Sequence, residues 1–206
     1  MNMPFSNLEK RVFKRGYQVV AGIDEVGRGS LAGPVAAAVV VARRPTRSIA
    51  MTKIRDSKQL TEKQREEIFE IVKNNPDFLW KVSFVWPRTI DKINIWQATL
   101  LAWQRCLKKL VSAKAGLDTL PDFLFLDGKF DLFGCPSTSS RLSSGLRSGN
   151  KYLLSERPTL GGESKTYSKI TQKPIIKGDQ KVFLLSLASI VAKVSRDRLM
   201  KKLDQK

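Results

Sequence analysis

Histidine is absent from this chain of 206 residues, and cysteine occurs only at Cys106 and Cys135. Without histidine the chain cannot contain a Ser–His triad, a histidine general base or a histidine-ligated zinc ion. Two cysteines are too few for a disulfide scaffold or, alone, for a structural zinc site, and they fit a reducing compartment. Any chemistry must therefore come from carboxylates, lysine, tyrosine, serine or cysteine.

Long hydrophobic runs are also lacking. The longest apolar stretch, Leu31–Ala42, contains Gly33 and Pro34 and ends at Arg43. It is shorter than the roughly 18–20 residues that a membrane helix needs. The N-terminus mixes charged and apolar residues and has no clear signal-peptide core. We therefore expect a soluble, cytoplasmic protein without a membrane partner.

Acidic residues are scarce relative to basic ones. Against 37 Lys and Arg there are 19 Asp and Glu, which gives a formal net charge of +18. Such an excess of positive charge concentrates polyanions near the surface and speeds encounter with nucleic acid. A ribosomal-type or merely soluble basic protein has the same balance. Composition therefore favours nucleic-acid binding and says nothing about catalysis.

Apolar stretches predict strands at four places. Residues 18–42 contain two buried strands, separated by the turn formers of Gly27–Pro34. Their near-continuous apolar character is typical of a sheet that is covered on both faces. A third strand is predicted at 78–86, ended by Pro87, and a short fourth strand at 122–126.

Three amphipathic helices are predicted between and after these strands. The first begins at Thr61, because Thr61-Glu62-Lys63-Gln64 has the form of a capping box. The second covers 93–110, where apolar residues recur at three- and four-residue steps, and the third covers 183–204. The fold class that follows is α/β.

The length and the hydrophobic content of 42% predict one domain over residues 1–206. Within it, residues 136–174 are rich in Ser, Gly and basic residues and have no sustained periodicity. We interpret them as a long surface insertion. Its basic residues either contact a phosphate backbone or belong to a solvated loop without a role.

Four carboxylates lie where a buried element meets a turn. Asp24 and Glu25 lie in an apolar strand, Asp127 follows another, and Asp179 precedes the last helix. A buried carboxylate costs several kcal/mol unless it is paired or binds a metal. Each alone could be a helix cap or a salt-bridge partner. Together, in a basic chain without histidine, they suit hard divalent cations such as Mg²⁺ or Mn²⁺.

Such a cluster suits phosphodiester hydrolysis assisted by two ions. Adjacent strand residues point to opposite faces, so Asp24 and Glu25 can reach one site in two ways. Either the strand breaks near Gly27, or Glu25 contributes from the side. The glycines of Gly27-Arg28-Gly29 could let a sugar-phosphate approach the backbone closely, or could simply form a turn.

Six blocks of sequence, in the same order, closely resemble the ribonuclease HII family. They span about residues 20–200, which is most of the chain. The blocks are Gly22–Gly29 with Leu31–Val35, Asp56–Thr61, Ile93–Thr99, Asp127-Gly128, Ile176–Asp179, and Ala188–Val194 with Arg196–Arg198.

The resemblance implies a ribonuclease-H-like fold, with a mixed central sheet flanked by helices. It implies a monomeric endonuclease that hydrolyses the RNA strand of RNA–DNA hybrids and cuts at ribonucleotides embedded in duplex DNA. The products would carry a 5′-phosphate and a 3′-hydroxyl, and the cofactor would be Mn²⁺ or Mg²⁺.

Residue roles are implied in the same way. The acidic metal site would consist of Asp24, Glu25, Asp127 and Asp179. The substrate-binding residues would be Gly27, Arg28, Gly29, Lys58, Ser189 and Lys193. Of these, Gly27-Arg28-Gly29 would read the ribose 2′-hydroxyl, the group that distinguishes RNA from DNA.

Two departures from the family and two rival classes qualify the resemblance. Asp127 and Asp179 are 52 positions apart (179 minus 127), more than is usual, and residues 136–174 account for the excess. The chain stops at Lys206, before the family's His-Lys-Gly-Tyr-like segment, so we expect weakened selectivity at the RNA–DNA junction.

A non-catalytic nucleic-acid-binding remnant would not need the four acids. The Gly-Arg-Gly and Asp-Ser-Lys blocks argue against a resolvase or transposase.

Overall fold

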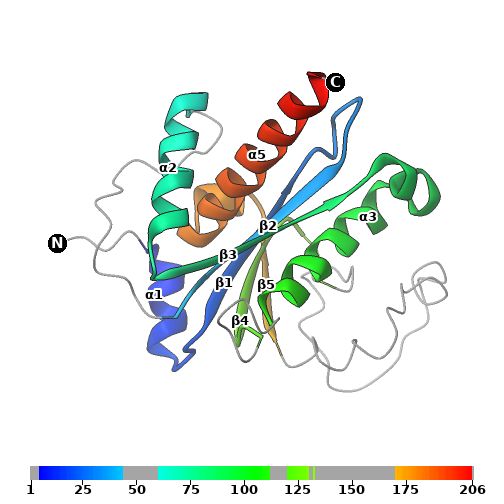
Figure 1. The fold of residues 1–206 in the computed structure, drawn as a ribbon. Helices are drawn as coiled ribbons and strands as arrows, with labels where there is room; N and C mark the ends of the chain where they lie inside the picture. Colours follow the sequence, from blue (N-terminus) through cyan, green and yellow to red (C-terminus); the bar gives the residue numbers. More distant parts are fainter. Residues whose placement is uncertain (1–4, 44–59, 112–119, 130–131, 133–169, 206) are drawn as a thin grey trace, which may run out of the picture.

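The computed structural model describes residues 5–43, 60–111, 120–129, 132 and 170–205. Lys58, Cys135 and most of the predicted insertion lie outside these ranges. The described ranges form a mixed sheet with helices on both faces (Figure 1). The fold class predicted from the sequence is therefore confirmed.

Five strands of the described ranges form one sheet in the order β3-β2-β1-β4-β5. The first three pair antiparallel, whereas β4 runs parallel to β1 and β5 runs parallel to β4. All of β2 and most of β1 are buried, which is why their sequences are almost continuously apolar. The strands are β1 (Val20–Val26), β2 (Val35–Ala42), β3 (Phe78–Val85), β4 (Phe123–Asp127) and β5 (Thr171–Ile175).

Helices divide the core into two layers. One helix, α3, packs on one face of the sheet, while α1, α2 and α5 pack on the other (Figure 1). No helix of the described residues is both long and apolar enough to cross a membrane. The helices are α1 (Asn7–Lys14), α2 (Glu62–Asn74), α3 (Pro87–Leu110) and α5 (Phe183–Asp204), with a short 3₁₀ turn, η1 (Gly178–Gln180), before α5.

The start of α5 presses directly on β1 at Gly22. A Cβ atom on Gly22 would lie 2.6 Å from the carbonyl carbon of Leu184, a distance that real Cβ atoms do not adopt. Glycine therefore permits this close packing of helix on strand. Because Asp24 follows two residues later on the same face of β1, the contact fixes α5 beside that carboxylate.

The predicted strands and helices are confirmed, including the capping box of α2. Gln64 N donates to Thr61 Oγ1 over 3.3 Å, and Thr61 N donates to Gln64 Oε1 over 2.9 Å. The strand predicted at 78–86 is β3, and the short strand predicted at 122–126 is β4. The last predicted helix is α5.

Three features differ from the sequence interpretation. Helix α3 begins at Pro87, six residues before the prediction (93 minus 87), since proline is well suited to the first turn of a helix. Asn94 interrupts α3 with φ 65° and ψ 166°, and its side chain accepts from Gln97 N over 3.0 Å, which starts the helix again. The end of the predicted insertion 136–174 is wrong, because β5 begins at Thr171. In addition, α1 was not predicted.

Candidate active site

A cavity of about 410 Å³ gathers the four predicted carboxylates. They reach it from β1, β4 and η1, three elements that are far apart in sequence. The carboxylates that the sequence places at three separate turns are therefore close together in the fold. The lining residues are Asp24, Glu25, Val26, Arg65, Asp127, Asp179, Ser189, Ile190 and Lys193.

Strand β1 delivers Asp24 and Glu25 from opposite faces without breaking. Its pairing with β2 continues to Val26, whereas its pairing with β4 ends at Ile23. Asp24 accepts a hydrogen bond from Ser189 on α5, and Glu25 lies toward Trp103 on α3. Beyond the end of β4, side chains of both faces can line the same open space. Of the two alternatives, the break in the strand is wrong, and Glu25 lines the cavity from the other face of β1.

Asp127 and the 3₁₀ turn η1 are joined by a backbone contact. Gly178 N donates to Asp127 Oδ1 over 2.7 Å. A Cβ atom on Gly178 would lie 2.3 Å from Leu185 Cδ1, so a side chain there would require the Leu185 side chain to move. Lys177 adopts the left-handed conformation with φ 55° immediately before the turn. This geometry brings buried Asp179 next to the end of β4.

Burial and mutual repulsion weaken the ionisation of the β1 carboxylates. The pKa of Asp24 is raised well above its usual value, first by burial and then by the charges of Glu25 and Asp127. The pKa of Glu25 is also raised, mainly by burial, although Arg28 opposes the rise. Both effects favour any cation that enters the cavity, since a cation stabilises the charged form of each acid.

The donor atoms fit a hard divalent cation. All four acidic side chains offer oxygen ligands, the type that Mg²⁺ and Mn²⁺ prefer. Glu25 Oε2 is buried and accepts no hydrogen bond from the described residues. In the ranges that the structure describes, no three acidic or cysteine side chains already stand as a complete ligand set for one ion. The residues that would hold such an ion are the four acids of the cavity lining, which supply the right kind of donor atom.

The Gly27-Arg28-Gly29 turn adjoins the cavity but does not line it. Arg28 Nη1 lies 3.1 Å from Glu25 Oε1, and the Arg28 guanidinium lies 5.4 Å from the centroid of the Trp96 ring. Gly27 has φ 100°, and a Cβ atom on it would lie 2.7 Å from Arg196 Nε. Around Gly29, in contrast, a Cβ atom would meet nothing within 4 Å. The turn thus has no room for a side chain at Gly27, whereas the space around Gly29 is open.

The other predicted substrate residues have different outcomes. Ser189 and Lys193, one turn apart on α5, both line the cavity, and Lys193 Nζ lies 2.8 Å from Asp197 Oδ1. Lys58 lies outside the described residues. Arg65 lines the cavity from α2 and was missed by the sequence interpretation. An arginine on an amphipathic helix gives no signal of this kind, because most such residues lie on a solvated face.

Comparison with known proteins gives the class of this fold. A similar structure is the ribonuclease H2 from Pyrococcus horikoshii, with a TM-score of 0.60 and 26% sequence identity over 91% of this chain and 76% of that one. Bst-RNase HIII in complex with Mn²⁺ has a TM-score of 0.60 at 20% identity and covers 92% of this chain. The chain therefore has a ribonuclease-H-like fold.

Sequence comparison defines the family. A model of the ribonuclease HII family matches residues 21–117. Ribonuclease HII of Caldicellulosiruptor saccharolyticus is 36% identical over 197 residues, which are 95% of this chain and 74% of that relative. Ribonuclease HII of Fusobacterium nucleatum is 38% identical over 91% of this chain and 68% of the relative. The chain belongs to the bacterial ribonuclease HII family, and it is an enzyme of the ribonuclease H type.

Proposed function

We propose that the chain cuts the RNA strand of RNA–DNA hybrids, and also cuts at ribonucleotides embedded in duplex DNA, with Asp24, Glu25, Asp127 and Asp179 as its catalytic centre. The observation that carries this proposal is the shared cavity of these four carboxylates, reached from β1, β4 and η1. The net charge of +18 supports a polyanionic substrate.

The four carboxylates would hold Mg²⁺ or Mn²⁺. Such ions would supply activation of the attacking water and stabilisation of the leaving 3′-oxygen, a chemistry that would yield a 5′-phosphate and a 3′-hydroxyl. The protein's own contribution is to hold the ligands in place. Ser189 fixes Asp24 by a hydrogen bond, and Gly178 N fixes Asp127. Such supporting contacts orient the ligands of a metal and tune its affinity.

The choice of RNA would come from the turn beside the cavity. In this proposal the open backbone around Gly29 approaches the sugar, and Arg28, held by Glu25 and Trp96, stands next to it. Backbone N–H groups can donate to a 2′-hydroxyl, a group that DNA lacks. Lys193, at the rim on α5, and Lys58 would contact the strand that is cut.

One assay tests the proposal directly. Three labelled duplexes are incubated with the protein: an RNA–DNA hybrid, a DNA duplex with one ribonucleotide, and an all-DNA control. Each is tested with Mg²⁺, with Mn²⁺ and with a chelator. We expect cleavage of the first two duplexes only, and only with a divalent ion. Cleavage of the all-DNA duplex at the same rate, or cleavage in the chelator, would overturn the proposal.

A further inference from the structure

Arg65 is a basic residue in the wall of a cavity that is otherwise dominated by carboxylates. It is half-buried, and its Nη1 donates to the carbonyl oxygen of Leu60, which leaves further guanidinium N–H groups for other partners. The other basic residue of the lining, Lys193, lies 2.8 Å from Asp197 Oδ1. Arg65 and Lys193 reach the cavity from different helices, α2 and α5.

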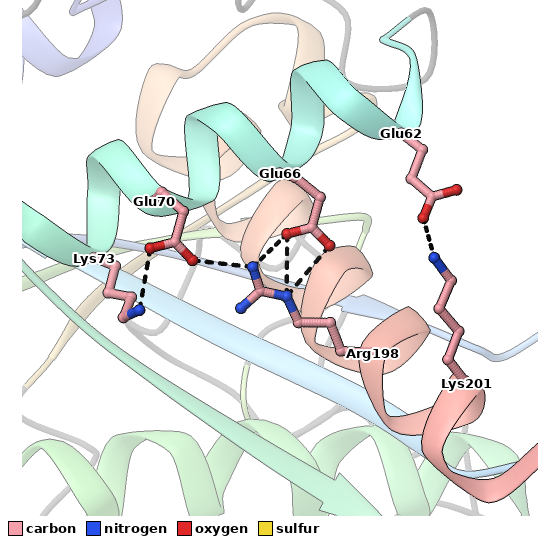
Figure 2. Close-up of polar contacts among 6 residues, drawn as sticks. All are labelled: Glu62, Glu66, Glu70, Lys73, Arg198 and Lys201. Atoms are coloured by element: carbon pink, nitrogen blue, oxygen red, sulfur yellow. Dashed lines mark hydrogen bonds and ion pairs between the residues drawn. The ribbon is translucent and has the colours of Figure 1, made fainter. Parts of the chain in front are cut away.

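Helix α2 is fastened to α5 by the polar network in Figure 2. Arg198 on α5 donates to both Glu66 and Glu70 of α2, with 3.0 Å to Glu70 Oε1, and Lys201 bonds Glu62. The Arg198 guanidinium also lies 4.5 Å from the centroid of the Phe69 ring. A single exposed ion pair contributes little, but several charges that share partners form a firmer connection.

This network fixes the position of Arg65 relative to the acids. Glu62, Glu66, Phe69 and Glu70 occupy the face of α2 that meets α5, and Arg65 lies on the same side of the helix at helical spacing. Helix α5 also carries Ser189 and Lys193. The contacts between α2 and α5 therefore fix the position of Arg65 relative to these two residues of the lining. These contacts of α2 thus hold the backbone of Arg65 near the acids, and its side chain is held by the hydrogen bond to the carbonyl oxygen of Leu60.

The charges of the cavity explain what a fixed arginine could do there. A phosphodiester strand that reaches the four carboxylates is repelled by them. Positively charged side chains near the cavity, in addition to bound metal ions, offset this repulsion. The planar guanidinium donates two parallel hydrogen bonds to a phosphate, which sets the position of the strand in addition to attracting it. Such contacts position nucleic acid without reading its sequence.

We propose that Arg65 binds a phosphate group of the nucleic-acid strand that enters the acidic cavity, and that the contacts of Arg198 and Lys201 with α2 hold it in that position. The inference rests on the proposed function, because it takes a nucleic-acid duplex as the substrate of the cavity. Arg65 is a substrate-binding residue, while Arg198 and Lys201 are positioning residues.

The test compares Arg65→Gln with Lys63→Gln. Both variants remove one positive charge from the first turns of α2, but Lys63 is exposed and does not line the cavity. Binding of an RNA–DNA hybrid is measured over a range of salt concentrations in the presence of a chelator. We expect Arg65→Gln to weaken binding about tenfold and to reduce the slope of log affinity against log salt by about one, as loss of a phosphate contact does. Lys63→Gln should change both much less.

Arg65→Lys provides the rescue. It keeps the charge and should restore the salt slope, although it cannot reproduce a two-bond contact and should regain only part of the affinity. The thermal unfolding midpoint of each variant shows whether α2 stays folded. If Arg65→Gln stays folded and binds the hybrid as Lys63→Gln does, with the same salt slope, the inference is overturned.

The same preparations separate this inference from the proposed function. The unmodified protein is assayed for cleavage of the hybrid with Mn²⁺. If it cleaves while Arg65→Gln and Lys63→Gln bind alike, only the role of Arg65 fails. If it does not cleave, the proposed function fails, whatever the binding of the variants.

Discussion

At the scale of single residues, Asp24 is almost fully buried, and its pKa is raised first by this burial and then by the charges of Glu25 and Asp127. A neutral side chain of similar size would avoid this electrostatic cost, so the charge of Asp24 does not by itself stabilise the fold. Binding a cation is the simplest requirement that the surroundings of Asp24 meet.

The first prediction concerns Asp24→Asn. Asparagine keeps the size of the side chain but loses the charge, so the variant should lose on the order of a hundredfold or more in cleavage with Mg²⁺. Binding of the duplex in a chelator should stay the same or become tighter, because a negative charge facing phosphates is removed. Gel-based cleavage and binding assays measure the two effects. Near-normal turnover of Asp24→Asn would show that the centre has been assigned to the wrong residues.

The second prediction concerns Glu9, a buried carboxylate outside the cavity. It accepts hydrogen bonds from Phe183 N over 3.0 Å and from Leu184 N over 2.8 Å, and so caps the start of α5 from α1. Burial raises the pKa of Glu9 from 4.5 to about 7. The folded state therefore binds this proton more tightly than the unfolded state. The contribution of Glu9 to stability is fully present below about pH 4.5 and is lost as the pH rises to about 7.

Glu9→Gln should remove this pH dependence. Between pH 5 and pH 8 the free energy of unfolding of the unmodified protein should fall, relative to that of Glu9→Gln, by an amount on the order of 2 kcal/mol. Urea unfolding at several pH values gives both quantities. Parallel pH profiles for the two proteins would contradict the assignment of a raised pKa to Glu9.

At the scale of elements, α5 is the helix on which the site depends. It carries Ser189 and Lys193 in the cavity lining and Arg196 one turn further on. Arg196 is buried, and it donates to the carbonyl oxygens of Pro34 over 3.0 Å and Ala32 over 2.8 Å. The helix thereby supports the loop that contains Gly27-Arg28-Gly29 as well as the acids.

The third prediction compares Gly27→Ala with Gly29→Ala. At Gly27 the backbone has φ 100° and a Cβ atom would collide with Arg196, so the substitution should lower the free energy of unfolding by roughly 1–3 kcal/mol. At Gly29 a Cβ atom meets nothing within 4 Å, so stability should be nearly unchanged. Thermal unfolding of both variants checks these values.

Gly29→Ala also tests how closely the substrate approaches the turn. If the sugar contacts the backbone there, the added methyl group should lower cleavage of a duplex with one ribonucleotide even though the fold is intact. Equal cleavage by Gly29→Ala and the unmodified protein would exclude close contact at this residue.

The elements that were predictable from the sequence have a strong local signal. The apolar runs of β1 and β2 and the capping box of α2 are examples. In contrast, β5 is a partly exposed edge strand that contains Pro174, and its residues lack the apolar pattern of the central strands. The start of α3 was missed because Pro87 suits both the end of a strand and the first turn of a helix.

The site was predictable to a similar degree. The four acids follow from their places at the ends of buried elements, and all four line the cavity. The route of Glu25 into the cavity depends on where the pairing of β4 stops, which is a property of the sheet register. The presence of Arg65 depends on how α2 packs against α5, and no local pattern encodes that packing.

At the scale of the whole molecule, the net charge of +18 governs how the protein meets its substrate. Lys and Arg side chains that contact phosphates release counterions, so affinity for a duplex should fall steeply as salt rises. The fourth prediction is that hybrid and all-DNA duplexes show similar, steep salt slopes, because backbone contacts do not distinguish them. Fluorescence titration at several salt concentrations measures these slopes, and a flat slope would contradict a charge-driven encounter.

The basic segment 136–174 can be tested in the same experiment. A deletion has to stop before Ile170, since the strand β5 begins at Thr171 and pairs with β4. A variant that lacks residues 137–169 should have a smaller salt slope if its basic residues contact the backbone. An unchanged slope and affinity would assign these residues to a loop that does not take part in binding.

The measurement that tests the central claim most directly is a calorimetric titration of Mn²⁺ into three proteins: the unmodified chain, Asp127→Asn and Asp77→Asn. Both substitutions remove one negative charge. Asp127 lines the cavity, whereas Asp77 is exposed and lies outside it. We predict that Asp127→Asn weakens Mn²⁺ binding by roughly tenfold or more, and that Asp77→Asn leaves it unchanged. Equal binding of Mn²⁺ by all three proteins would contradict the assignment of the acidic cavity as a metal centre.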